Sequence, residues 1–500
     1  MLFGPTGSGM RTGYNAVIGL EVHAQLTTAS KAFCSCPTDF GAQPNVNACP
    51  ICLGHPGTLP VLNKNLVAYA VKMGLATNCS IREVSSFSRK NYFYPDLPKG
   101  YQVTQYADPI CFGGSVEIET DAGVKHIGIT RIHMEEDAGK SIHDLDIDTL
   151  VDLNRAGVPL IEIVSEPDIR SAHEAYQYLQ QIRQILMYLG ICDGNLEEGS
   201  LRCDANISVR PDGQDDFGTR REVKNLNSFR NVEKAIEYEI GSQIDTLKNG
   251  GTVVQQTLMW DAGAQKTKLM RSKEEAHDYR YFSEPDLVPV VVDEAWRMEL
   301  QQSLPELALA KKRRFIEQYG IPTYDAGILV DNSDVALMYE ETCSQLVPAS
   351  SEAFKLVSNW TMTEMLRIMG EHKCGINEVG VTSSQLASLV NAITNGKISS
   401  KTAKELFPDM IGSGRVAQEF IDERGLSQIS DEGAIKMLVD DVIRNNPDNL
   451  KKYSEGKTNL FGFFVGQVLK ASGGSANPSI VSSLMKEALE SVQGSNTLEE

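Results

Sequence analysis

Polar and apolar residues alternate in several segments of the first half of the chain, and this period of two predicts β-strands. In residues 17–26 the alternation places Glu21 and His23 on one face, with leucine and valine on the other. In residues 159–164, Glu162 lies between two isoleucines and therefore points away from both. The sequence thus predicts extended segments that carry carboxylate and imidazole groups on a polar face.

A third strand-like segment, residues 201–210, has one polar face of mixed charge that includes Arg202 and Asp204. Helical spacing of apolar residues follows Asn63, Ser171 and Ser228, and both serines stand at N-cap positions. Strands and helices intermix up to about residue 294. This mixture favours an α+β fold, with one large domain built on an antiparallel sheet.

Strand signals nearly vanish beyond residue 293, and the remaining chain reads as helices. We expect a helix to begin at Leu304–Glu306, with further helices over residues 324–339, 352–369, 382–395 and 399–406. The predicted parts are a leader, a large sheet domain, an all-α helical domain and an α-helical tail domain: residues 1–15, 16–294, 295–407 and 408–500. The Gly-rich leader is not interpreted as a phosphate-binding loop, because Met10 stands where such a loop requires Lys. We therefore expect it to be a flexible leader.

Size and composition place the chain among ordinary globular proteins. It has 500 residues, 41% of them hydrophobic and 23% charged, which predicts several domains and argues against disorder. No apolar run reaches about 18 residues and the leader lacks a signal-peptide core, so we expect a cytoplasmic protein without a membrane role. The net charge of −19 requires any contact with RNA to be local or to depend on shape.

Four of the ten cysteines cluster in two pairs on short turns: Cys34, Cys36, Cys49 and Cys52. Four thiolates at this spacing suit a tetrahedral Zn²⁺ ion, and a site with four protein ligands would be structural. Two disulfides or free thiols are the alternatives. The expected compartment argues against the disulfides.

Residues 130–170 are dense in carboxylates, several of them inside apolar segments. The adjacent Glu135 and Glu136 repel each other unless a cation lies between them or one of them takes up a proton. A hard divalent ion such as Mg²⁺, with phosphate on its far side, would meet this requirement. The alternative is a solvated acidic face. The polar strand with Glu21 and His23 favours the cation site.

Residues 87–102 interleave Arg89, Lys90 and Lys99 with four aromatic residues, and residues 277–286 form another charged and aromatic loop. Such a segment can stack a nucleobase and pair with phosphate. It can equally be a surface strand of amphipathic side chains. The sequence leaves both interpretations open.

Seven motifs occur in order: IGLEVHAQL, FSRKNYFYPDLPKGYQ, HMEEDAGK, DLNRAGVPLIEIVSEPDIR, EEGSLRCDANISVR, VKNLNSF and DYRYFSEPDLVP. The segment KYSEGKTNLFGFFVGQVLKASGGSANP follows near the C-terminus. With these motifs the chain resembles the family of B subunits of bacterial aspartyl/glutamyl-tRNA(Asn/Gln) amidotransferases. The resemblance covers residues 14 to about 490 and leaves out the leader.

This resemblance implies a ligase that works as a heterotrimer. The B subunit of the family binds Glu-tRNA(Gln) or Asp-tRNA(Asn) and transfers the γ-phosphate of ATP to the side-chain carboxylate. Ammonia from a glutaminase A subunit then displaces phosphate, and a small C subunit braces the pair. The family has a cradle-shaped N-terminal domain, a helical domain and a tail that contacts tRNA. A tRNA-binding scaffold without chemistry and a free-standing metal phosphohydrolase are the alternatives.

The resemblance also implies roles for individual residues. His23, Glu136 and Glu162 match the family's Mg²⁺ ligands, with Glu21 and Glu135 close by. We expect Glu136, Lys90 and Arg89 to act in catalysis, and Lys90, Arg202 and Asp204 to bind the nucleotide cofactor. The cysteine cluster matches a zinc site that some members of the family have and others lack.

Overall fold

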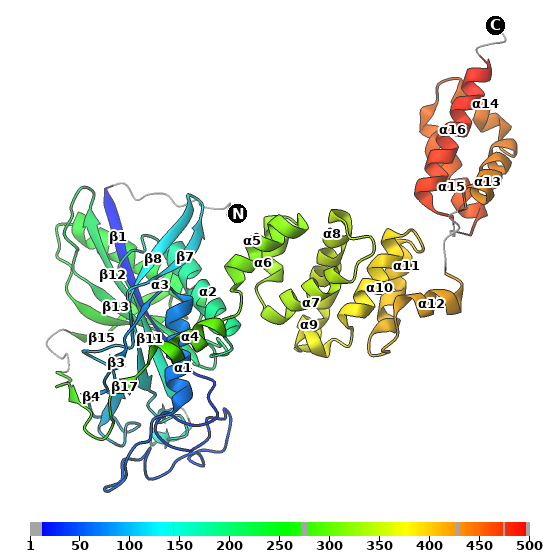
Figure 1. The fold of residues 1–500 in the computed structure, drawn as a ribbon. Helices are drawn as coiled ribbons and strands as arrows, with labels where there is room; N and C mark the ends of the chain where they lie inside the picture. The colour runs from blue at the N-terminus through cyan, green and yellow to red at the C-terminus, as the bar shows by residue number, and fades with distance from the viewer. Residues whose placement is uncertain (1–12, 144, 273–277, 427–430, 474–475, 497–500) are drawn as a thin grey trace. The chain divides into compact units, whose positions relative to one another are not determined.

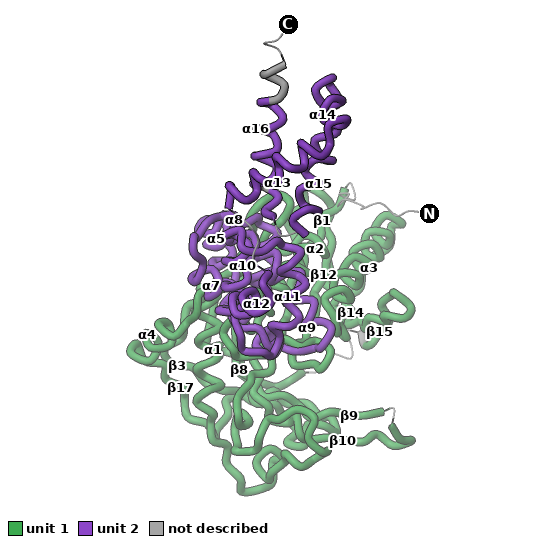
Figure 2. Tube along the Cα trace, turned by 90° about the vertical axis from the view of Figure 1, so that its right-hand side faces the viewer, with its two compact units in different colours: residues 1–307 green, residues 308–500 purple. Residues whose placement is uncertain are grey.

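The computed structural model describes residues 13–143, 145–272, 278–426, 431–473 and 476–496 (Figure 1). The chain divides into two compact units, Met1–Leu307 and Ala308–Glu500 (Figure 2). The predicted leader lies outside the described residues as far as residue 12, and Tyr14 already begins the first strand. Among the described helices, none has the length and apolar character needed to cross a bilayer.

A 13-stranded sheet organises the first unit. Its strands are β1 (Tyr14–Gln25), β2 (Ser80–Ile81), β4 (Ser88–Asn91), β5 (Tyr101–Thr104), β6 (Cys111–Phe112), β7 (Ser115–Thr120), β8 (Gly123–Glu136), β11 (Pro159–Ser165), β12 (Leu201–Pro211), β13 (Arg221–Leu226), β14 (Gln256–Asp261), β15 (Lys266–Ser272) and β16 (Phe282–Ser283). The main path runs β15-β14-β13-β12-β1-β11-β8-β5-β4-β16. Neighbours on this path are antiparallel except β13 and β14, so the sheet is mixed.

Two smaller pairs complete the strands of this unit. β9 (Lys140–Ile142) and β10 (Leu150–Asp152) form an antiparallel hairpin that projects from the unit in Figure 2. β3 (Val84–Ser85) pairs with β17 (Val290–Val291).

Three helices pack on one face of the sheet: α1 (Lys64–Ala76), α2 (Ala172–Tyr188) and α3 (Phe229–Lys248). Val22, Met134 and Ile161, on three neighbouring strands, are fully buried in the apolar core on this side. The alternating residues of the same strands carry polar groups to the other side. Ser171 and Ser228 cap α2 and α3, as the sequence predicts.

The first unit ends with α4 (Glu294–Gln302), a helix that the sequence pattern did not predict. Its Trp296 and Leu300 join the apolar core of this unit, and the helix contacts α1. The predicted helix start at Leu304–Glu306 is wrong, because α5 begins only at Ala308. Pro305 restricts the residue before it to extended conformations, which keeps Leu304 out of a helix.

Every element that the structure describes in the second unit is a helix. Its helices are α5 (Ala308–Tyr319), α6 (Thr323–Leu329), α7 (Ser333–Ser344), α8 (Ser351–Trp360), α9 (Leu366–His372), α10 (Ser383–Thr394), α11 (Ser400–Met410), α12 (Ala417–Arg424), α13 (Glu432–Arg444), α14 (Pro447–Ser454), α15 (Phe461–Ala471) and α16 (Pro478–Asn496). A π-helical turn, Thr361–Met365, joins α8 to α9. The single helix predicted over residues 324–339 is two helices, α6 and α7.

The last helices of this unit share a small apolar core of their own. It includes Ile435, Val439, Phe464, Val468 and Met485, which are fully buried. Because every described strand lies in the first unit, the predicted α+β class is confirmed. The predicted division between a helical domain and a tail domain at residue 408 stays a prediction.

Candidate functional site

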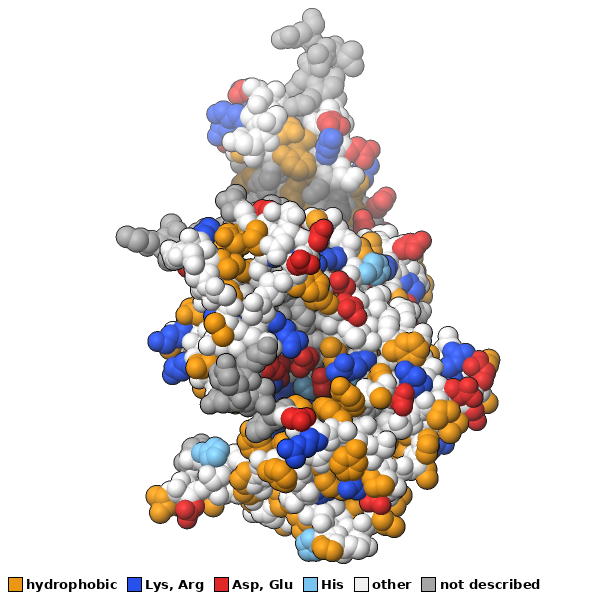
Figure 3. Space-filling model, turned by 90° about the vertical axis from the view of Figure 1, so that its left-hand side faces the viewer, with side chains coloured by type: hydrophobic (Ala, Val, Ile, Leu, Met, Phe, Trp, Pro, Cys, Tyr) orange, Lys and Arg blue, Asp and Glu red, His pale blue; other side chains and the backbone are white. Residues whose placement is uncertain are grey.

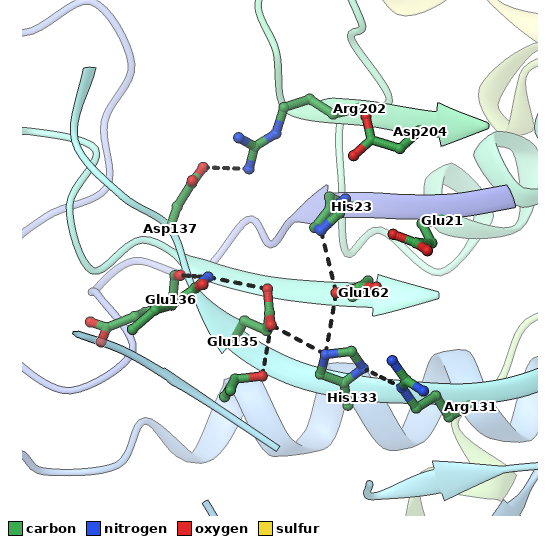
Figure 4. Close-up of polar contacts among 12 residues, drawn as sticks. Glu21, His23, Arg131, His133, Glu135, Glu136, Asp137, Glu162, Arg202 and Asp204 are labelled. Carbon is green, nitrogen blue, oxygen red and sulfur yellow. Dashed lines mark hydrogen bonds and ion pairs between the residues drawn. The ribbon is translucent and has the colours of Figure 1, made fainter. Parts of the chain in front are cut away.

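Three adjacent strands bring a cluster of acidic and imidazole groups together on the polar face of the sheet (Figure 4). His23 on β1 lies opposite Glu162 on β11, and Glu162 lies opposite His133 on β8. Ligand atoms of His23, Glu135 and Glu162 lie within 4.8 Å of one another. His23 thus joins two carboxylates that lie more than a hundred positions further along the chain, and we call this group the cation cluster: His23, Glu135 and Glu162.

The spacing within this group suits a small divalent cation. The Nε2 atom of His23 lies 3.4 Å from Oε2 of Glu162. The Nε2 atom of His133 lies 3.3 Å from the same oxygen and 3.2 Å from Oε1 of Glu135. Adjacent ligands of octahedral Mg²⁺ are about 3.0 Å apart when the metal–oxygen distance is about 2.1 Å. The donor set and spacing are therefore compatible with such an ion.

The imidazoles and the two buried carboxylates of this site shift each other's pKa values. Burial alone lowers the pKa of His133, but Glu162 and Glu135 raise it to about 9. Burial acts to raise the pKa of Glu162, but His133 and His23 hold it well below its usual range. Protons on the imidazoles thus offset part of the negative charge of the cluster in the metal-free protein, and a bound cation would replace them.

Sequence reasoning did not single out His133, although its signal was present. His133 and Glu135 are two residues apart in β8 and therefore share a face. The Glu135 carboxylate also accepts hydrogen bonds from Thr104 Oγ1 at 2.6 Å and from Gln102 Nε2 at 3.1 Å. These donors come from β5, the next strand of the sheet, and hold the carboxylate in place.

Lys90 on β4 faces the same charges. Burial lowers its pKa, but Glu135 and other nearby groups raise it above the ordinary value, so Lys90 is cationic. Its Nζ lies 4.9 Å from the ring centroid of Tyr279 and 5.9 Å from that of Tyr92. Among the residues that the structure describes, no carboxylate forms an ion pair with Lys90. A half-buried ammonium group beside these carboxylates suits an anionic ligand such as phosphate.

Glu136, predicted to share an ion with His23 and Glu162, does not join the cation cluster. Its carboxylate is paired with Lys99 and accepts the backbone N–H of Val103 at 2.9 Å. Successive side chains of a strand point to opposite faces of the sheet, so the neighbours Glu135 and Glu136 lie on different sides (Figure 4). The structure therefore places Glu135, rather than Glu136, beside His23.

Arg89 likewise points away from Lys90. Its guanidinium donates two hydrogen bonds of 2.8 Å to Glu284 and one of 3.1 Å to Asp286. It also lies 4.2 Å from the ring centroid of Tyr101. A pocket on this side is lined by residues that include Lys99, Tyr101, Glu136, Glu284, Asp286, Cys34 and Cys52. Arg89 and Glu136 thus belong to a second polar environment.

The remaining predicted cofactor residues, Arg202 and Asp204, lie on β12 beside β1. Arg202 pairs with Asp137 at 2.8 Å. Asp204 forms a second acidic group with Glu21 and Glu222, whose ligand atoms lie within 4.8 Å of one another. Lys224 forms ion pairs with Asp204 and Glu222 and neutralises part of this group. In Figure 3 acidic and histidine side chains gather in a hollow, with Lys and Arg side chains around it.

The four predicted zinc ligands come together, with one ligand atom of each within 4.8 Å of the others: Cys34, Cys36, Cys49 and Cys52. The Cys52 sulfur lies 3.6 Å from that of Cys49 and 3.9 Å from that of Cys36. Tetrahedral Zn²⁺ with bonds of about 2.3 Å requires sulfur atoms about 3.8 Å apart. The cluster fits this ion.

A buried lysine lies against the cysteine cluster. Lys31 is 1% exposed, and its Nζ donates to the Asn47 carbonyl at 2.5 Å and to the Leu153 carbonyl at 3.4 Å. Its third partner is the Cys52 sulfur at 3.8 Å. A hydrogen bond from Cys34 lowers the pKa of Cys52, and the Lys31 ammonium acts in the same direction. A thiolate is the form of cysteine that binds metal.

Comparisons with known proteins agree over nearly the whole chain. The family description "GatB/GatE catalytic domain" matches residues 16–298, and "GatB domain" matches residues 341–489. Two relatives, from Chlorobium phaeobacteroides and Syntrophotalea carbinolica, are named as the B subunit of aspartyl/glutamyl-tRNA(Asn/Gln) amidotransferase, and each is 54% identical to the chain. The alignments cover 95% and 96% of this chain and 99% of each relative. A protein of the same name from Thermodesulfovibrio yellowstonii is 53% identical over 95% of this chain.

The matched regions include every strand of the cation cluster and of the second acidic group. Such identity over at least 95% of the chain identifies its family. The chain belongs to the GatB/GatE family.

Proposed function

We propose that the chain is the B subunit of a glutamine-dependent tRNA amidotransferase. It would phosphorylate the side-chain carboxylate of Glu-tRNA(Gln) or Asp-tRNA(Asn) with ATP and complete its amidation with ammonia. The observation that carries this proposal is the cation cluster with Lys90 beside it on one polar face. The names of the relatives support the same activity.

The geometry suits phosphoryl transfer, which depends mainly on positioning and on neutralising charge. His23, Glu135 and Glu162 would hold Mg²⁺, which neutralises phosphate charge when it is bound. Lys90 would donate to a phosphate oxygen, and Arg202 lies on the neighbouring part of the same face. The amino-acid carboxylate attacks the γ-phosphorus and ADP leaves. Ammonia then attacks the acyl phosphate, loses a proton and displaces phosphate, which leaves the amide.

The partners and location follow from the same proposal. A glutaminase A subunit would supply ammonia and a small C subunit would complete a heterotrimer in the cytoplasm. The tail, residues 408–500, would contact the tRNA backbone through lysines that include Lys451, Lys452 and Lys457. The cysteine cluster would hold a structural Zn²⁺ outside the reaction.

The test is phosphate release from γ-³²P-labelled ATP by the complex of the three subunits. Release that requires Glu-tRNA(Gln) or Asp-tRNA(Asn), followed by amide formation, is the expected result, and each tRNA is assayed separately. Lys90→Met is expected to slow phosphoryl transfer about 100-fold or more, because one donor to the developing charge is lost. Lys266→Met, an exposed lysine on β15, serves as the matched control.

Two results would contradict the proposal. Tight tRNA binding without any tRNA-dependent phosphate release would make the chain a binding scaffold. Rapid ATP turnover without tRNA would make it a phosphohydrolase.

A further inference from the structure

Four tyrosines gather beside the cation cluster without a role in the chemistry above: Tyr92, Tyr106, Tyr279 and Tyr281. Tyr106 and Tyr281 stack face to face, with centroids 4.0 Å apart and ring planes at 9°. Tyr279 meets the edge of this stack at 6.0 Å from Tyr281, and Tyr92 lies 6.0 Å from Tyr279. The rings form a continuous aromatic surface from two distant segments of the chain.

Hydrogen bonds connect this surface to the cation cluster. The Tyr92 hydroxyl donates to Gln102 Oε1 at 3.1 Å, and Gln102 Nε2 donates to Glu135 Oε2 at 3.1 Å. Thr104, which donates to the other oxygen of Glu135, precedes Tyr106 by only two residues. The aromatic surface and the carboxylates are therefore parts of one site.

Lys90 lies between the rings and the carboxylates. Its Nζ is 4.9 Å from the Tyr279 centroid. Burial raises the pKa of the Tyr281 hydroxyl. The charges of Lys90, which lowers this pKa, and of Glu135, which raises it, also act on the hydroxyl, so Tyr281 lies close to both groups. A ligand whose flat end covers the rings can therefore direct an anionic end to Lys90 and the cation cluster.

The stacked pair is accessible. Tyr106 is 60% exposed although one side of its ring covers Tyr281. A tyrosine has only two side-chain torsions, so a stacked ring loses little entropy when a planar ligand binds. Stacking of a nucleobase on an aromatic side chain needs a flat, open ring face, and the outer side of Tyr106 provides one.

We propose that the Tyr106–Tyr281 pair is a stacking platform for an adenine ring. This inference rests on the proposed function, which brings two adenine groups to this face, in ATP and in the 3′-terminal adenosine of tRNA. Stacking itself accepts any base, so adenine is specified by the substrates of the proposed function, while Lys90 next to the platform would attract the anionic part of the ligand.

The test uses 2-aminopurine, an adenine analogue whose fluorescence falls when it stacks. One probe is 2-aminopurine riboside triphosphate, and the other is tRNA that ends in 2-aminopurine. Each is titrated into the complex of the three subunits. Tyr106→Leu and Tyr281→Leu are expected to weaken the binding of one of the two probes by about 5- to 100-fold. The probe whose binding is weakened identifies the source of the adenine.

Matched variants separate stacking from other effects. Tyr106→Phe and Tyr281→Phe keep the ring and are expected to bind within about threefold of the unchanged chain. Tyr324→Leu removes a tyrosine side chain that is 74% exposed and lies on α6, outside the stack, and it should leave the binding of both probes unchanged. Circular dichroism of each variant confirms that it folds.

The platform is refuted if both leucine variants bind both probes as the unchanged chain does, or if the phenylalanine variants lose as much as the leucine variants. This readout needs no turnover. If probe binding depends on the rings but tRNA-dependent phosphate release is absent, the platform stands and the proposed function fails.

Discussion

Glu135→Gln and Glu136→Gln remove the same charge from adjacent positions of β8, and the structure predicts different consequences. Glu135 belongs to the cation cluster with His23 and Glu162. Glu136 is paired with Lys99 on the other side of the sheet. We expect Glu135→Gln to weaken divalent-cation binding strongly, and Glu136→Gln to change it little.

The magnitude follows from the geometry. The ligand atoms of the cluster lie within 4.8 Å of one another, so an ion among them lies about 3 Å or less from each. At an effective dielectric constant of about 20, a divalent ion and one carboxylate attract by about 11 kcal/mol at 3 Å. Lost hydration offsets most of this, and removal of one partner from a buried charge pair costs about 3–5 kcal/mol. Glu135→Gln should thus weaken binding roughly 100-fold or more.

Glu136→Gln should change cation affinity by less than about fivefold, because the lost charge acts from a greater distance. It should instead lower the free energy of unfolding by about 1–3 kcal/mol, because Lys99 loses its carboxylate partner. Mn²⁺ titration followed by electron paramagnetic resonance measures affinity, and urea unfolding measures stability. If Glu136→Gln abolished Mn²⁺ binding while Glu135→Gln retained it, the assignment of the two faces would be wrong.

Three further predictions concern protons, zinc and a buried ion pair. Burial alone lowers the pKa of His133, but the cluster carboxylates raise it to about 9. Protonated His133 therefore stabilises the metal-free protein at pH values below the pKa of an unfolded histidine, and this stabilisation is lost as pH rises through about 9. Mn²⁺ affinity should rise over the same pH range, and a pH-independent affinity would contradict the prediction. Lys31→Met should weaken zinc binding about 10-fold or more in chelator competition, whereas Lys266→Met should not. Arg221→Met removes the cationic partner, at 3.1 Å, of the fully buried Glu239, which keeps its hydrogen bond from Gln243. The free energy of unfolding in urea should fall by about 3 kcal/mol, and a change below about 1 kcal/mol would exclude this prediction.

The faces of individual strands could be predicted from the sequence. The period of two places Glu162 on the other face of the strand from its isoleucine neighbours, and both isoleucines are fully buried in the core. It also places Glu21 and His23 on one face, and each belongs to a group of potential cation ligands. The spacing of the four cysteines similarly predicted their proximity.

The order of the strands could not be predicted in the same way. Only the pairing of β8 between β11 and β5 shows that Glu135, rather than Glu136, lies beside His23. The stack of Tyr106 on Tyr281 joins segments 175 positions apart, so no local pattern could indicate it. The cation ligands and the nucleotide contacts themselves stay predictions.

The opposite orientation of Glu135 and Glu136 limits how the length of β8 can vary. One residue inserted or deleted within residues 131–136 would turn all later side chains to the other side of the sheet. The carboxylate that faces an imidazole would then face an ammonium group, and both environments would lose their partners in one step. Insertions in relatives are therefore expected at the tight turn that leads into β8, next to its first residue Gly123, which has a φ of 113° and open space around it.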